Sequence, residues 1–252
     1  MNAYKTDKFD LQSSYSLEFW GEKEDDELLQ TQNVCLFTLL RCKSSKKLFL
    51  TTNNHLLFNR DRGDIKLLQI WLIKQSIEAI SKAFPTEPVY FVWAGDFNTL
   101  PFSPLYLYIR YNEVKQLLYV NPENWSGQTN GVNLWKQSKV ELSRLEEDLC
   151  FHYIGENSKG VDKCEKILNA VSSYTVRLSN DSLIISKSTK PGSWKTMCSE
   201  QRLQTRSAYA SDWQRRTNST DESSKMKGPT GEMLFSTVPI QDPYPVTVDY
   251  VL

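Results

Sequence analysis

The first hundred residues carry apolar positions in patterns that predict strands. Apolar side chains fall on odd positions between residues 9 and 19, the alternation of a half-buried strand. Residues 34–40 are continuously apolar, which is typical of a strand buried on both faces. Residues 48–55, after the polar hairpin connection 43–47, form a third predicted strand. Residues 89–93 predict a fourth strand, also buried.

Between the third and fourth strands the apolar period changes to that of a helix. The stripe consists of Ile70, Ile73, Ile77, Ile80 and Phe84. It predicts a helix over residues 64–84, with Asp61 or Asp64 capping its start. Ser103 followed by Pro104 predicts the start of a second helix that runs to Tyr111. We expect a mixed sheet with the 64–84 helix packed on one face.

Polar residues follow the third and fourth strands, where His55, Asp96 and Asn98 occur. If these strands run parallel, their ends lie on one rim of the sheet. An extended chain would point Asp96 and Asn98 to the same side, with Phe97 facing the core. A carboxylate and an amide there suit a hydrated metal or a water that attacks phosphorus. The sequence Gly-Asp-x-Asn is equally typical of a simple turn, and both interpretations stay open.

The second half of the chain shows weaker periodicity. Residues 132–200 have short apolar runs among Ser, Lys and Glu, and we expect a poorly ordered insertion there. His152 has no partner at ligand spacing and is expected to be structural or exposed. Residues 219–231 predict a flexible segment, and residues 246–251 predict a last strand of the sheet.

Composition excludes some classes of protein. Lys plus Arg equals Asp plus Glu, 30 each, so no global basic field attracts nucleic acid and any such binding must be local. The five Cys form no CxxC pair, which is typical of reduced thiols in an intracellular protein. No apolar run has the length of a membrane span, and no signal peptide is evident. We expect a soluble cytoplasmic or nuclear protein without a membrane partner.

Four stretches in register resemble a known family. They are Thr52-Asn53-Asn54-His55-Leu56-Leu57-Phe58-Asn59, Arg62-Gly63-Asp64-Ile65-Lys66-Leu67-Leu68-Gln69, Gly95-Asp96-Phe97-Asn98 through Ser103-Pro104-Leu105-Tyr106, and Val246-Thr247-Val248-Asp249-Tyr250-Val251. Together they resemble the endonuclease/exonuclease/phosphatase superfamily, and within it the Angel proteins, relatives of nocturnin and of the carbon-catabolite-repression-type deadenylases. Trp125-Ser126-Gly127-Gln128 is also similar to Angel proteins. The resemblance divides the chain into residues 1–128 and 203–252 of one domain, with residues 129–202 as a variable polar insertion.

The resemblance implies an α/β fold, a partial two-sheet sandwich, with a magnesium-dependent phosphoesterase site. It implies that His55 hydrogen-bonds the scissile phosphate and that Asp96 orients the attacking water. Asn98 would hold Asp96 and a phosphate oxygen, and Asp249 would steady a second histidine. Asp96 and Asn98 are the expected Mg²⁺ contacts, and the 3′ end of mRNA is the expected partner.

The chain also departs from the family pattern. The family's metal-binding Glu lies upstream of the matched stretches and its closing Ser-Asp-His lies beyond Asp249. Ser211-Asp212-Trp213 does not replace that closing motif, and Asn54 replaces a Thr. Whether the chain is an enzyme therefore stays open, and we expect little activity from it alone. The first hypothesis is a truncated Angel-like deadenylase or 2′,3′-cyclic phosphatase; the alternative is a non-catalytic RNA-binding or assembly subunit.

Overall fold

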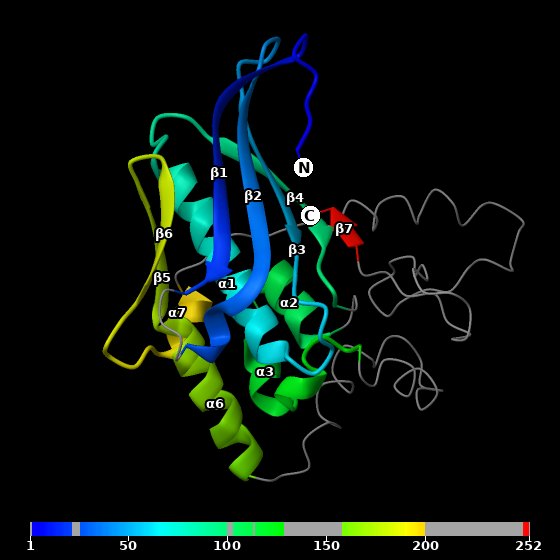
Figure 1. The fold of residues 1–252 in the computed structure, drawn as a ribbon, viewed down its shortest axis with the longest axis vertical. Helices are drawn as coiled ribbons and strands as arrows, with labels where there is room; N and C mark the ends of the chain where they lie inside the picture. The colour runs from blue at the N-terminus through cyan, green and yellow to red at the C-terminus, as the bar shows by residue number, and fades with distance from the viewer. Residues whose placement is uncertain are drawn as a thin grey trace, which may run out of the picture.

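The computed structural model describes residues 2–21, 26–99, 103–112, 114–128, 158–199 and 249–251. Its main element is a five-stranded sheet with the order β1-β2-β3-β4-β7 (Figure 1). The strands are β1 (Phe9–Trp20), β2 (Gln30–Cys42), β3 (Leu48–His55), β4 (Val89–Asp96) and β7 (Asp249–Val251). The predicted mixed sheet is confirmed.

Pairing directions in the sheet follow from the connections. β1, β2 and β3 pair antiparallel as consecutive strands. β3 and β4 are parallel, because the helix α1 (Gly63–Lys82) connects them as a crossover. β7 adds antiparallel to β4. The carboxyl ends of β3 and β4 therefore meet at one rim, as the strand–helix–strand pattern predicts.

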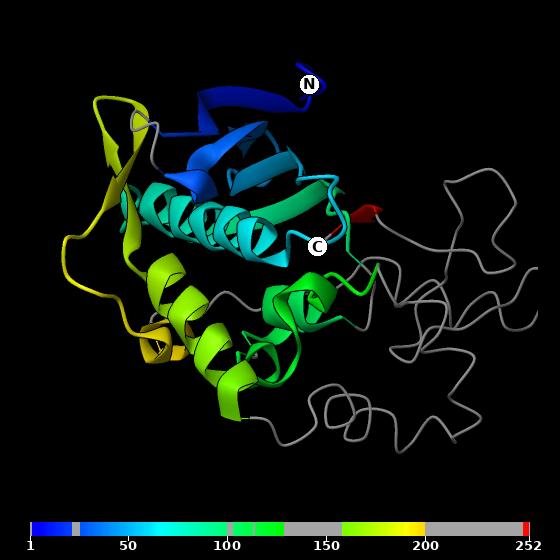
Figure 2. The ribbon, with the colours of Figure 1, turned by 60° about the horizontal axis from the view of Figure 1, so that its bottom comes forward.

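Helix α1 lies between the sheet and a second tier of helices (Figure 2). Most of its residues are buried, including Trp71 and the four predicted Ile positions, because both sides of the helix are covered. The predicted cap of α1 is wrong. Arg62 occupies the cap position without a side-chain cap, and its guanidinium forms an ion pair with Asp64 at 3.0 Å instead.

The second tier consists of α2 (Pro104–Tyr111), α3 (Lys115–Tyr119), α6 (Ser158–Ser172) and α7 (Trp194–Ser199). The predicted start of α2 is confirmed, since the Ser103 hydroxyl accepts a hydrogen bond from the Tyr106 N–H at 3.2 Å. Two single-turn 3₁₀ helices, Glu27–Leu29 and Pro122–Asn124, complete the described helical elements. None of the described helices has both the length and the hydropathy that a bilayer crossing needs.

Residues 158–199 differ from the expected poorly ordered insertion. They form α6, α7 and the hairpin β5 (Tyr174–Ser179) and β6 (Ser182–Lys187), a two-stranded antiparallel sheet beside α1. Tyr174 is fully buried and its carbonyl accepts a hydrogen bond from the Trp71 indole at 2.9 Å. The expectation fails here because the apolar residues are few but helix-spaced, so that α6 can still bury one face.

The face of the sheet opposite α1 is more open than the sequence predicts. Tyr90 and Val92 on β4 are 44% and 38% exposed, while Trp93 on the α1 face is 1% exposed. The prediction that residues 89–93 form a buried strand is therefore confirmed for the face that packs on α1 and wrong for the other face. Residues 34–40 are likewise only partly covered there, with Val34 exposed and Leu36 half-buried.

Some expectations lie outside the described residues. These are the placement of His152, of residues 219–231, of Ser211-Asp212-Trp213 and of the strand before residue 249. The division of the chain at residues 128 and 202 stays a prediction.

Candidate functional site

The candidate site begins with His55 and Asp96 at the ends of β3 and β4. The parallel register places these two residues opposite each other. The His55 Nε2 atom lies 3.6 Å from the Asp96 Oδ2 atom, and the two side chains are 66% and 30% exposed. This separation is longer than a direct hydrogen bond and leaves no room for a molecule between the two atoms, so a ligand that contacts both groups would lie beside the pair.

A close backbone approach sets this register. Gly95 has a φ of 139° and lies opposite Asn54, where an added Cβ would be 2.1 Å from the Asn54 carbonyl oxygen. The buried Asn54 side chain accepts a hydrogen bond from the Trp93 indole and donates one to the Asp96 carbonyl at 3.1 Å. The Asn at position 54 thus fixes the backbone of Asp96 from the neighbouring strand.

Asn98 organises the turn that follows β4. Its backbone N–H donates to Asp96 Oδ1 at 2.8 Å, and its side-chain Nδ2 donates to the Leu56 carbonyl at 2.9 Å. Its φ of 44° lies in the left-handed region, which Asn tolerates. The expected extended geometry is therefore wrong at Asn98, and the turn interpretation describes the backbone. Phe97 does face the core, fully buried.

A second hydrogen-bond network holds the backbone after β3. The Asn33 side chain donates to the His55 carbonyl at 2.8 Å and accepts from Gln69 at 3.2 Å. Gln69 in turn accepts from the Leu57 N–H at 2.9 Å. Gln69 comes from α1 and Asn33 from β2, so two elements fix the position from which His55 extends.

Lys66 is a site neighbour that the sequence reasoning did not identify. It is fully buried in the first turns of α1, and its Nζ donates to the Asn98 carbonyl at 2.8 Å and to Gln128 Oε1 at 2.6 Å. Burial lowers the pKa of Lys66 to about 7, and the nearby Asp96 charge acts in the opposite direction. The available signal was a Lys inside the short apolar run Ile65-Lys66-Leu67-Leu68.

Asp249 is brought to the same rim from the far end of the chain. β7 pairs with β4 so that the backbone of Asp249 lies opposite Asp96. The structure therefore places His55, Asp96 and Asn98 together and adds the Asp249 backbone beside them.

The described residues supply only part of a magnesium site. Asp96 offers one carboxylate oxygen, Oδ2, that no described hydrogen bond occupies. Asn98 is 3% exposed and its amide is tied to Leu56, which favours a role in holding Asp96. Among the residues that the structure describes, no group of three His, Cys, Asp or Glu could hold a metal ion. These residues therefore do not fit a complete Mg²⁺ site by themselves.

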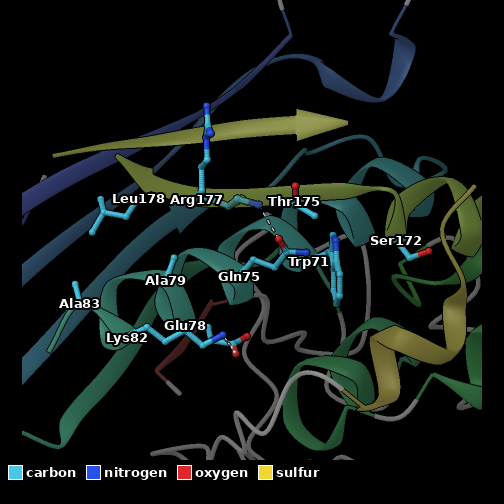
Figure 3. A pocket seen from close by; sticks show the side chains of 11 residues that line it. Trp71, Gln75, Glu78, Ala79, Lys82, Ala83, Ser172, Thr175, Arg177 and Leu178 are labelled. Carbon is cyan, nitrogen blue, oxygen red and sulfur yellow. Dashed lines mark hydrogen bonds and ion pairs between the residues drawn. The ribbon is translucent and has the colours of Figure 1, made fainter. Parts of the chain in front are cut away.

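A cleft lies away from this rim, between α1 and β5 (Figure 3). Its volume is about 780 Å³, and its walls include Gln75, Glu78, Lys82 and Arg177. Gln75 is bonded to β5, and Lys82 forms an ion pair with Glu78 at 2.7 Å. Gln75 is nine residues beyond Lys66 along α1, roughly 14 Å along the axis. The cleft therefore does not belong to the rim that carries His55 and Asp96.

Comparisons with known proteins show which proteins the chain resembles. No family model matches the chain. Protein angel homolog 2 from Bos taurus is 36% identical over 111 residues, which is 43% of this chain and 20% of the relative. Carbon catabolite repressor protein 4 homolog 3 from Arabidopsis thaliana is 31% identical over 127 residues, 50% of this chain and 27% of the relative. Over about half of its length the chain is therefore similar to the Angel proteins and to a carbon catabolite repressor protein 4 homolog.

A solved structure supports the fold of this Angel-like chain. The crystal structure of ANGEL2, a 2′,3′-cyclic phosphatase, in complex with adenosine-2′,3′-vanadate matches with a TM-score of 0.55 and 24% identity. The match covers 98% of the Angel-like chain and 56% of that structure. The chain spans about a fifth of the length of the curated Angel relatives it matches.

Proposed function

We propose that this Angel-like chain carries part of a magnesium-dependent phosphoesterase site for RNA 3′ ends. The observation that carries the proposal is the 3.6 Å approach of His55 Nε2 and Asp96 Oδ2 at the ends of adjacent parallel strands. A 2′,3′-cyclic phosphate is the preferred end, because the solved relative ANGEL2 is described as a 2′,3′-cyclic phosphatase. Removal of poly(A), the other expected activity, needs the same phosphoryl chemistry.

In the proposed reaction the chain positions water and phosphate. Asp96 Oδ2 accepts a hydrogen bond from the attacking water, while the Asn98 N–H holds Oδ1 and fixes the carboxylate. His55 donates a hydrogen bond to a non-bridging phosphate oxygen. The water oxygen bonds to phosphorus and gives one proton to Asp96 Oδ2. One of the two ester P–O bonds breaks, and the leaving sugar oxygen takes up a proton from solvent. The product is a phosphomonoester.

Mg²⁺ would supply charge neutralisation on the phosphate oxygens when bound. Asp96 would offer that ion one carboxylate oxygen, Oδ2. Because it is a single carboxylate, we expect turnover by the 252-residue chain alone to be below detection. The same observation favours a second candidate function, an RNA-binding subunit that recognises the end without cleaving it.

The test compares two ends of one oligonucleotide. Fluorescence anisotropy would measure the affinity of the 252-residue chain for a labelled RNA ending in a 2′,3′-cyclic phosphate and for the same RNA ending in a 3′-hydroxyl. We expect the cyclic end to bind more tightly. His55→Ala should reduce that preference by about tenfold or more, because a hydrogen bond to a charged group contributes roughly 1.5–3 kcal/mol.

Lys43→Ala is the matched control, since Lys43 is a cation at the opposite end of the sheet, paired with Asp10 at 3.3 Å. It should lower the affinity for both ends equally. Equal binding of the two ends by the unmodified chain would contradict the proposal. A Mg²⁺-dependent phosphatase assay then separates the two candidates: turnover abolished by Asp96→Ala indicates an enzyme, and binding without turnover indicates a recognition subunit.

A further inference from the structure

Two lysines on α1 are fully buried, and one of them lies beside the candidate site. Lys66 and Lys74 are both 0% exposed, and burial lowers the pKa of each to about 7. Each amino group donates to one backbone carbonyl and one side-chain amide oxygen. Lys74 donates to Tyr108 and Asn112, and so stabilises the carboxyl end of α2, away from the rim that carries His55 and Asp96. Lys66 makes the same pair of bonds directly beneath the candidate site.

The Lys66 bond to Asn98 bears on the geometry of Asp96. Asn98 is 3% exposed, so its carbonyl depends on Lys66 for a donor. The N–H of the same residue holds Asp96 Oδ1, and its side chain holds the Leu56 carbonyl next to His55. A buried carbonyl without a donor is costly. Loss of Lys66 would therefore let the left-handed turn at Asn98 relax and release the carboxylate.

The second Lys66 bond joins the site to the stretch 125–128. Gln128 Oε1 accepts from Lys66 at 2.6 Å. Ser126 accepts from the Thr99 hydroxyl at 3.2 Å through its carbonyl, and its own hydroxyl donates to the Arg60 carbonyl at 3.1 Å. This stretch therefore contacts both the loop after β3 and the turn after β4. Residues 125–128 are among the residues that resemble Angel proteins, and no step of the proposed reaction uses them.

We infer that Lys66 is a positioning residue for the proposed phosphoesterase site. Its bond to Asn98 fixes the turn that orients the Asp96 carboxylate towards His55, and its bond to Gln128 connects it to the 125–128 stretch. The inference rests on the proposed function, and it adds Lys66 and Gln128 to the residues on which recognition of the RNA end depends.

The test uses Lys66→Met, with Lys74→Met as the matched control. Both variants remove a buried amino group with two acceptors from the same helix, so both should lower the urea midpoint of unfolding. Only Lys66→Met should reduce the preference for the cyclic-phosphate end. The loss should reach about tenfold, because the relaxed turn at Asn98 would no longer hold the Leu56 carbonyl next to His55, whose bond to the phosphate is of that order. A purely structural role for Lys66 predicts equal effects of the two variants on that preference.

Hydrogen exchange supplies a second readout that needs no RNA. The Asn98 amide should exchange at least tenfold faster in Lys66→Met, after correction for the change in global unfolding, and at an unchanged rate in Lys74→Met. Should Lys66→Met not fold, Gln128→Ala replaces it, since Gln128 is only half-buried. It should produce a smaller loss of end preference in the same direction.

The outcomes separate the two proposals. If Lys66→Met, or Gln128→Ala in its place, still prefers the cyclic-phosphate end as strongly as the unmodified chain does, the positioning role is overturned and the proposed function stands. An end preference absent from the unmodified chain overturns the proposed function and the positioning role with it. Loss of preference in Lys66→Met together with faster Asn98 exchange, both absent from Lys74→Met, supports the inference.

Discussion

The contact between Gly95 and Asn54 allows a quantitative test of the parallel register. The φ of 139° at Gly95 is open to glycine and costs other residues about 1–3 kcal/mol. In Gly95→Ala the new methyl would also lie 2.1 Å from the Asn54 carbonyl oxygen and 2.8 Å from the Asn54 nitrogen. These are backbone atoms of a central strand, which cannot rotate away, so overpacking adds about 1–3 kcal/mol. We expect Gly95→Ala to lower the free energy of unfolding by about 2–6 kcal/mol.

Urea unfolding followed by tryptophan fluorescence would measure this loss, with buried Trp93 as a reporter two residues away. Ala94→Gly is the control in the same strand, and it should cost only about 0.5–1 kcal/mol. A loss in Gly95→Ala no larger than that of the control would show that β3 and β4 do not approach as described. The opposition of His55 and Asp96 would then lose its basis.

Two further predictions concern α1 and its neighbours. Tyr174→Phe removes the hydroxyl that donates hydrogen bonds to the Asp26 carboxylate. It should lower the free energy of unfolding by about 1.5–3 kcal/mol and speed proteolysis within residues 158–199. Unchanged proteolysis would contradict the packing of that segment. Burial lowers the pKa of Lys74 to about 7, whereas a Lys in the unfolded chain has a pKa of about 10.4. Between these two pH values the unfolded chain binds more protons than the folded one. The free energy of unfolding should therefore rise with pH over that window, by at most about 1.4 kcal/mol per pH unit. Lys74→Met should remove this contribution, and equal pH slopes of unfolding in the two proteins would refute it.

The sequence predicts most of the elements that carry the site. Strand alternation and the Ile stripe identify β1 to β4 and α1, because these elements bury regular faces. The strand–helix–strand order then places His55 and Asp96 on one rim through the parallel pairing. Ser103 and Pro104 locate the start of α2, since cap chemistry is local.

The contacts that shape the site could not be predicted in this way. The left-handed turn at Asn98 and the burial of Lys66 depend on packing between elements distant in the sequence. The insertion prediction missed α6 because Cys164, Leu168 and Val171 are helix-spaced but stand among polar residues. The burial of Tyr90 and Val92, on the face of β4 opposite α1, also depends on which elements pack against that face. The composition of the strand does not determine those partners.

The central claim is that the rim formed by β3 and β4 binds an RNA 3′-end phosphate. Titration of the isotope-labelled chain with adenosine 2′,3′-cyclic phosphate, followed by backbone amide chemical shifts, tests it directly. We predict the largest shifts at residues 54–57 and 96–99, and their loss in His55→Ala. Shifts concentrated at residues 71–83 and 172–178, around the cleft between α1 and β5, would contradict the claim.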